Sequence, residues 1–188
     1  MKKTTELEKS FVAAAEAVGA QVVECKSLQQ AVDYLAEQID GTLLCPSFAS
    51  GERAGLVDKL TKAGLTLVTD DFRRQAPTAK AGITGVNFAM ADTGSLALES
   101  TDEDIRLATT LPEVQFALLD PQKILADSLE AVAPLRQLHQ RDPRNYIAYI
   151  TGPSRTADIE RVLTIGAHGP KQLHILLVPK LSSDLLEM

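Results

Sequence analysis

The sequence of 188 residues contains no tryptophan, and its aromatic fraction is only 4%. Its 25 acidic residues outnumber its 19 basic ones, which gives a formal net charge of −6. Nucleic-acid binding normally needs a basic surface, and often aromatic rings on which bases stack. The composition therefore argues against nucleic acid as a partner.

Cysteine is also scarce, because Cys25 and Cys45 are the only two. Their spacing matches no zinc or iron–sulfur motif, so both are expected to be reduced thiols in or near the core. The sequence shows no paired histidines, no HExxH, no Asp-rich calcium motif and no GxGxxG after a strand. We therefore expect the chain itself to bind no metal and no dinucleotide cofactor.

The chain lacks apolar runs long enough to span a bilayer. Its opening, MKKTTELEKS, is not followed by the apolar stretch that a signal peptide needs. These absences predict a cytoplasmic protein without a membrane span. The length and the apolar fraction of 45% fit a single globular domain over residues 1–188.

Helix-like and strand-like patterns alternate along the chain, which predicts an α/β fold of three layers, α/β/α, around a mostly parallel sheet. An amphipathic helix is expected over about 5–18, with Thr5 and Glu8 as a capping box, packed on the domain. Short apolar runs that end in turn residues predict strands at 42–46, 65–69, 114–119 and 172–179.

The middle of the chain departs from this alternation. Residues 70–81 are polar and indicate an exposed connection, and 82–87 indicate a short helical turn. Two apolar segments, 88–91 and 95–99, then flank a tight turn with glycine, which predicts an antiparallel hairpin. Such a pair would make the sheet mixed.

The last third is predicted to alternate again. Asp120 and Pro121 are typical of a helix start, and the apolar spacing from Ile124 to Leu135 predicts a long amphipathic helix. A strand at 146–150 and a helix at 155–165 should follow.

The segment TGPSRTADIE at 151–160 raises a choice between a helix cap and an anion site. At the carboxyl end of a strand, Gly152 would allow close backbone approach, while Ser154 and Arg155 would offer a helix N-terminus and a positive charge to an anion. Serine, threonine and aspartate are equally ordinary capping residues. The spacing leaves both readings open.

The hairpin turn offers a second candidate site. Asp92, Thr93 and Ser95 could present oxygens to a ligand, with Gly94 present for the turn geometry, although aspartate and glycine are also common turn formers. Asp92 and Glu99 are the candidates for a catalytic carboxylate, although Glu99 could equally be the polar end of a strand.

Two further polar residues have open roles. Arg106 could anchor a carboxylate or a phosphate, or it could be one more exposed arginine. His168, between two glycines, could serve in acid–base chemistry. If 155–165 is a helix of about 15 Å, His168 should lie at the opposite edge of the sheet from Ser154. A structural or interface role is then expected for His168.

Four motifs in this order carry a family resemblance: GITGVNFAMADTGSLALES, RLATTLPEVQFALL, GPSRTADIE and GAHGPKQLHILLV. Together they resemble the LUD-domain family, and within it the lactate-utilisation protein C type (LutC/YkgG). The resemblance implies a fold like that of the ribose-isomerase, glucosamine-deaminase and CoA-transferase superfold. It also implies a part in oxidation of L-lactate to pyruvate, beside two iron–sulfur proteins, the A- and B-type components.

Oxidation of lactate needs a redox cofactor, since no side chain can accept the electrons. The leading hypothesis is thus an accessory subunit of a lactate-oxidising system, with the iron–sulfur clusters on its partners. Its loops would bind a small anion or a partner surface; the residues expected there are Thr93, Gly94, Ser95, Arg106, Gly152, Ser154, Arg155 and Thr156.

Two rival hypotheses remain. The superfold also suggests a stand-alone enzyme acting on a phosphorylated or CoA-linked substrate, although fold is a poor guide to function. A homodimeric binding module without turnover is the third reading.

Overall fold

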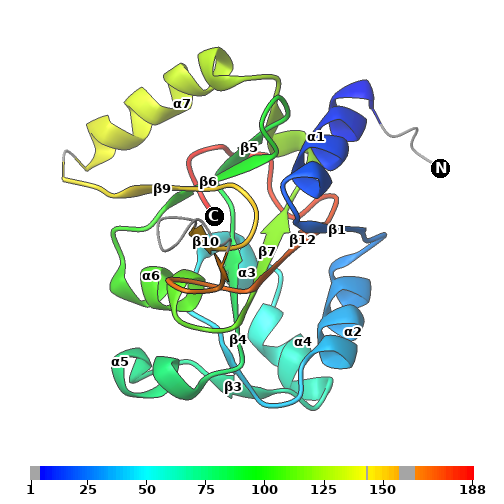
Figure 1. The fold of residues 1–188 in the computed structure, drawn as a ribbon, viewed down its shortest axis with the longest axis vertical. Coiled ribbons are helices and arrows are strands. Elements are labelled where there is room, and N and C mark those ends of the chain that lie inside the picture. The colour runs from blue at the N-terminus through cyan, green and yellow to red at the C-terminus, as the bar shows by residue number, and fades with distance from the viewer. Residues whose placement is uncertain (1–4, 143, 157–163) are drawn as a thin grey trace.

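The computed structural model describes residues 5–142, 144–156 and 164–188. Its centre is a six-stranded sheet in which every pair of neighbours is parallel. The strands, in spatial order, are β1 (Gln21–Glu24), β12 (Gln172–Leu177), β7 (Val114–Leu119), β4 (Ala81–Gly85), β2 (Thr42–Leu44) and β3 (Thr66–Val68). The predicted α/β fold with a mostly parallel sheet is confirmed (Figure 1).

A second sheet of four strands has the order β8 (Ile124–Leu125), β5 (Phe88–Met90), β6 (Ser95–Glu99) and β9 (Ile147–Ile150). The predicted hairpin is confirmed, since β5 and β6 pair antiparallel. It belongs to this second sheet, so within the described residues the central sheet is parallel rather than mixed. Only Val86 and Asn87 separate β4 from β5, and the chain passes from one sheet to the other there.

Seven α-helices lie in the described part of the chain: α1 (Glu6–Ala17), α2 (Leu28–Gln38), α3 (Ala49–Arg53), α4 (Leu56–Lys62), α5 (Phe72–Gln75), α6 (Glu103–Thr110) and α7 (Ser128–Arg141). In Figure 1, α2 and α4 lie together at one end of the molecule, whereas α7 lies at the other, above β9. Thr5 caps α1 through the expected capping box with Glu8.

The side chains of the central strands alternate between two cores, as the pleat requires. On one face, Phe116 and Leu118 of β7 pack with residues of α2 and α4. On the other face, Ala117 and Leu119 pack with Phe11 of α1 and with the second sheet. A smaller core lies between α5 and α6. The parallel sheet is therefore covered on both faces, which is the usual condition of such sheets.

The expectation of a helical turn at 82–87 is wrong. Residues Ala81–Gly85 form β4, a strand at the centre of the sheet that is buried throughout. Its glycines indicate close packing rather than a turn, because a Cβ on Gly82 would be 2.0 Å from the main-chain oxygen of Ala108 in α6. The sequence pattern alone does not distinguish these two uses of glycine.

Residues 70–81 are also more ordered than a polar connection. They contain α5 and a 3-10 helix, Ala76–Thr78, and they bury Phe72 and Ala76 against α6. The polar residues between these two side chains mask the apolar pattern.

The long helix of the last third begins later than expected. Asp120 caps a 3-10 helix, Pro121–Lys123, and β8 then pairs with β5. The helix α7 starts only at Ser128, with Asp127 as its cap.

The predicted helix over 155–165 is wrong at both ends. Arg155–Thr156 form β10, which pairs antiparallel with β11 (Thr164–Ile165). The remainder of that prediction, 157–163, lies outside the described residues. No helix in the described ranges is both long and apolar enough to cross a membrane.

Candidate functional site

The two glycines of the predicted ligand loops lie against the end of α1. A Cβ on Gly94 would be 2.3 Å from the main-chain nitrogen of Ala15, and one on Gly152 would be 2.2 Å from the oxygen of Val18. Both have positive φ values, 65° and 70°, which glycine adopts without strain. These glycines are explained by close packing against α1, before any ligand is invoked.

The hairpin turn and the 151–156 segment also contact each other directly. The Ser95 and Thr151 hydroxyls form a hydrogen bond of 2.7 Å, and Ser95 is buried. Asp92 and Thr93 project from the turn and are exposed. The structure thus joins Ser95 to Thr151, the residue before Gly152, and it leaves Asp92 at the tip exposed to solvent.

Glu99 and Arg106 stabilise the loop that follows the hairpin. The Glu99 carboxylate accepts hydrogen bonds from the main-chain nitrogen and the hydroxyl of Thr101. The Arg106 guanidinium donates to the main-chain oxygens of Ser100 and Thr101, 2.5 Å for each, and lies over the Tyr146 ring. Since Asp92 and Glu99 lie at opposite ends of β6, they do not share one site.

Ser154, Arg155 and His168 line a common cavity of about 400 Å³. The expectation that His168 lies at the opposite edge from Ser154 is therefore wrong, because Arg155 and Thr156 form β10, which pairs with β11 shortly before His168 in the chain. A Cβ on Gly169, next to His168, would lie 3.1 Å from Cβ of Ser154. The Arg155 guanidinium also donates to the main-chain oxygen of Val18.

This cavity lies at the amino ends of the central strands, not at their carboxyl ends. Gln115 and Leu173, which line it, are the second residues of β7 and β12. The preceding strand, β9, belongs to the second sheet, so the expected position at the carboxyl edge of the central sheet is wrong for 151–156, and 157–158 lie outside the described residues. Gln115 is 1% exposed and its Nε2 has no hydrogen-bond partner, which gives the cavity an unused donor. We name this space the amino-edge cavity.

The carboxyl edge carries a different set of polar groups. After β2 the chain continues to β3 on one side, whereas after β4 it continues to β7 on the other, so the adjacent strands β2 and β4 flank a topological switch point. Ligands of open α/β sheets bind outside the carboxyl ends of the strands at such a point. Asn87 follows β4, and Asp120 and Lys123 follow β7.

All three of these side chains are buried, at 1–2% exposure, beneath the segment 181–188. Asn87 accepts from the Glu99 nitrogen and donates to the Leu185 oxygen. Asp120 accepts from the nitrogens of Leu181 and Ser182. A carboxylate and an amide placed at strand ends thus hold this segment across the sheet edge.

Lys123 is the chemically distinctive member of this group. Its ammonium donates to the main-chain oxygens of Val86 (3.1 Å) and Glu187 (2.7 Å). Burial disfavours the charged amine and lowers the pKa of Lys123 to about 8, against the opposing effect of nearby acidic groups such as Glu187. A lysine with such a pKa can be neutral or charged near neutral pH, as acid–base and nucleophilic lysines are.

Glu187 forms the nearest ion pair. Both terminal nitrogens of Arg53 donate to its carboxylate, one at 2.9 Å, and the Ser182 hydroxyl donates to it as well. Arg53 holds the pKa of Glu187 at about 2. Arg53, Asn87, Asp120 and Lys123 are not among the site residues that the sequence motifs predict. Applying the strand-end rule to β4 and β7 would have found the last three.

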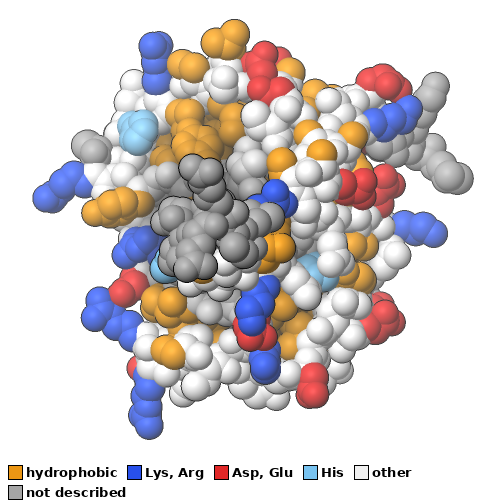
Figure 2. Space-filling view, viewed as in Figure 1, with side chains coloured by type: hydrophobic (Ala, Val, Ile, Leu, Met, Phe, Trp, Pro, Cys, Tyr) orange, Lys and Arg blue, Asp and Glu red, His pale blue; other side chains and the backbone are white. Residues whose placement is uncertain are grey.

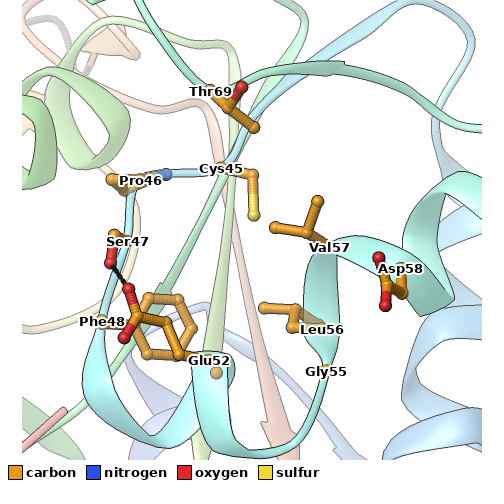
Figure 3. A pocket seen from close by; sticks show the side chains of 11 residues that line it. Cys45, Pro46, Ser47, Phe48, Glu52, Gly55, Leu56, Val57, Asp58 and Thr69 are labelled. Atoms are coloured by element: carbon orange, nitrogen blue, oxygen red, sulfur yellow. Dashed lines mark hydrogen bonds between the residues drawn. The ribbon is translucent and has the colours of Figure 1, made fainter.

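A second cavity, of about 310 Å³, lies next to this group, at the carboxyl ends of β2 and β3 (Figure 3). Figure 3 shows the Cys45 sulfur directed towards Val57 and the Ser47 hydroxyl bonded to Glu52, with Phe48 lining the lower part of the cavity. Burial raises the pKa of Cys45 to about 11, so its thiol is not activated. Both cysteines are free and buried, as expected.

Among the described residues, no three His, Cys, Asp or Glu side chains are grouped so that they could hold a metal ion.

Large apolar side chains are exposed on α7 and beside or within β9, and Figure 2 shows hydrophobic atoms gathered over that region. These side chains, with their exposed fractions, are Leu129 (79%), Val132 (40%), Tyr146 (64%) and Tyr149 (52%). Such gathered apolar side chains are typical of contact surfaces.

The open parallel sheet, covered on both faces and with polar groups at its strand ends, defines the protein as one of the α/β class. The chain belongs to the LUD domain family, whose model matches residues 7–178. Similar in fold is a DUF162 family protein from Deinococcus radiodurans, with a TM-score of 0.69 and 18% identity over 95% of this chain and 99% of that one.

Curated relatives share more sequence over shorter lengths. An uncharacterized protein of Neisseria meningitidis, NMB1437, is 39% identical over 52% of this chain and 42% of its own length. Lactate utilization protein B of Anoxybacillus flavithermus is 30% identical over 61% of this chain, and the match spans only 24% of that protein. The uncharacterized protein YkgG of Escherichia coli is 28% identical over 82% of this chain and 70% of its own length.

Proposed function

We propose that this chain is an accessory component of a lactate-utilisation system, of the lactate-utilisation protein C type, acting in the cytoplasm. The observation that carries the proposal is membership of the LUD domain family together with relatives named lactate utilization protein B. A further relative, YkgF of Escherichia coli, is named an electron transport protein and is 28% identical over 72% of this chain. That name fits a system in which electrons leave the substrate.

The chemistry of lactate oxidation determines which proteins of the proposed system must carry the electron acceptors. Two electrons leave the substrate, and a protein side chain does not accept them. The proposed system therefore places the electron acceptors, iron–sulfur clusters, on the A- and B-type partner proteins. The exposed apolar side chains of α7 and β9 give such a complex a surface on which to form.

A small anion remains the proposed ligand of the predicted loops. In the amino-edge cavity, Arg155 supplies positive charge, and Ser154 and Gln115 supply hydrogen-bond donors. The unpartnered Nε2 of Gln115 supports a polar occupant, because a buried donor without a partner carries a desolvation cost. Gly152 also lines this cavity, whereas Gly94 would act on it only through its packing against α1.

Anaerobic affinity purification from the native extract tests the proposal. We expect iron–sulfur proteins to co-elute, and we expect the eluate to reduce a dye when L-lactate is added. Depletion of this chain should remove the activity, and adding the purified chain back should restore it. The proposal is overturned if the chain elutes alone and its deletion leaves growth on lactate unchanged.

One specific observation favours a second candidate, a stand-alone enzyme for an anionic substrate. Lys123 and Arg53 place two cationic groups at the carboxyl edge, where this class of fold binds ligands. A screen of CoA, acyl-CoA and nucleotides against the isolated chain tests it. The stand-alone enzyme would be favoured over the accessory component if the wild type binds and turns over one of these compounds and Arg53→Ala does not bind it.

A further inference from the structure

Residues 181–188 cross the carboxyl edge of the central sheet and take up the polar groups found there. Asn87 and Asp120 bind its main chain, as described above, and the main-chain nitrogen of Ser50 donates to the Met188 oxygen at 2.8 Å. The Met188 side chain packs against both main cores. The segment therefore fills the position at which a ligand of this fold class would lie.

The fit of this segment depends on glycine at the end of β4. A Cβ on Gly85 would lie 2.7 Å from the Met188 carbonyl carbon and 2.9 Å from the Phe48 ring. An alanine at this position would clash with both groups. The absence of a side chain lets Met188 and the Phe48 ring pack directly on the end of the strand.

Two cationic side chains bind the same residue of the segment. Both terminal nitrogens of Arg53 donate hydrogen bonds to the carboxylate of Glu187, while the Lys123 ammonium donates to the main-chain oxygen of Glu187. Two-pronged arginine–carboxylate contact is the geometry by which proteins recognise free carboxylates. Lys123 is nearly inaccessible, yet it has no carboxylate partner among its hydrogen bonds to Val86 and Glu187.

We propose that Arg53 and Lys123 form a binding site for a short aliphatic carboxylate, and that Glu187 occupies this site until the ligand displaces it. Arg53 takes the ligand carboxylate in place of Glu187. Lys123, freed from the Glu187 oxygen, adds the second positive charge. The rest of the ligand takes the space above Gly85 that Met188 fills in this structure, which limits it to a few carbon atoms.

The exposure of the pair makes such an exchange feasible. The side chain of Arg53 is 55% exposed and that of Glu187 is 20% exposed, so both charges remain partly hydrated. A ligand carboxylate can therefore reach Arg53 from solvent without first uncovering a buried charge. This inference does not rest on the proposed role in lactate utilisation, because it follows from the occupied site alone.

Titration of the isolated chain with acetate, L-lactate and succinate, followed by NMR shifts of residues around Lys123, tests the proposal. Glu187→Gln removes the competing charge and keeps the side-chain size, so it should bind these carboxylates about fivefold or more tightly than the wild type. Asp184→Asn is the comparison variant, because Asp184 acts on Arg53 and Lys123 through its charge alone and forms no hydrogen bond with either. It should raise the affinity less than Glu187→Gln does.

A second variant identifies the contact. Arg53→Ala added to Glu187→Gln should abolish the gain, whereas chloride at equal ionic strength should not reproduce the carboxylate shifts. Acylation of Lys123 by acetic anhydride, read by mass spectrometry, should rise in Glu187→Gln and fall when succinate is added. Ser182→Ala, which also loosens Glu187, should show a smaller change in the same direction.

Equal affinities in the wild type, Glu187→Gln and Asp184→Asn would overturn the proposal, as would no binding to any of them. If Glu187→Gln does not fold, Ser182→Ala decides the matter, because unchanged affinity and unchanged Lys123 labelling in that variant would equally reject the site.

Discussion

Gly94 in the hairpin turn lies directly against Ala15 in α1, so that a Cβ on Gly94 would be 2.3 Å from the Ala15 main-chain nitrogen. The contact joins a turn and a helix that are almost eighty residues apart in sequence. It gives the glycine of the ADTGS motif a packing role that motif comparison does not reveal.

Gly94→Ala should consequently destabilise the fold strongly. A left-handed backbone costs a residue with a side chain about 1–2 kcal/mol, and the clash with main-chain atoms should add about 1–3 kcal/mol. Gly55→Ala is the matched control, because Gly55 has a φ of 64° but nothing within 4 Å of its Cβ position. Denaturant unfolding of both variants measures the difference. Equal losses would contradict the packing role of Gly94.

Ser95 and Thr151 should be energetically coupled. Their hydroxyls are 2.7 Å apart, and Ser95 is buried, so removing either one leaves the other without its partner. A double-mutant cycle with Ser95→Ala and Thr151→Val should give a coupling of about 1 kcal/mol in the free energy of unfolding. A coupling near zero would show that these hydroxyls do not stabilise each other, and a ligand role would gain weight.

Glu187 should make stability depend on acidic pH. Its pKa is lowered from 4.5 to about 2 by Arg53 and Ser182, so the folded state binds a proton less readily than the unfolded state. Its contribution is then fully present above pH about 4.5 and is lost as the pH falls towards 2. The difference in Tm between the wild type and Glu187→Gln should shrink over that interval. A difference that is constant from pH 6 to pH 3 would contradict the Arg53 pairing.

The two thiols should react slowly in the folded protein. Burial raises the pKa values of Cys25 and Cys45 to about 11, so at pH 8 only about one thiol in a thousand is ionised. Labelling with a disulfide reagent should be about 100-fold slower than after unfolding in guanidinium. Fast labelling of Cys45 in the folded state would show that the cavity of Figure 3 opens to solvent.

Much of the fold was predictable because local chemistry decides it. The capping box at Thr5 and Glu8, the short apolar strands and the hairpin around Gly94 all have signals within a few residues. The secondary structure of residues 82–87 was not predictable in this way. Their glycines permit a turn, and only the approach of α6 to Gly82 shows that they serve a central strand.

The candidate site was less predictable than the fold. Ser154 and His168 share a cavity that a wrong helix assignment had separated, because β10 and β11 place them on neighbouring segments. The carboxyl-edge group depends on which strands are neighbours. Once β4 is read as a turn, Asn87 and Lys123 have no reason to be placed together.

The glycines of β4 also bear on how the family diverges. At Gly82 the strand touches the main chain of α6, and at Gly85 it touches the segment 181–188, so neither position can accept even a methyl group without moving backbone. Among relatives, substitutions should therefore be rarest at the positions of these two glycines. Relatives can vary the exposed side chains of α5 more freely, because substitutions there do not change the distance between β4 and the layers that pack on it.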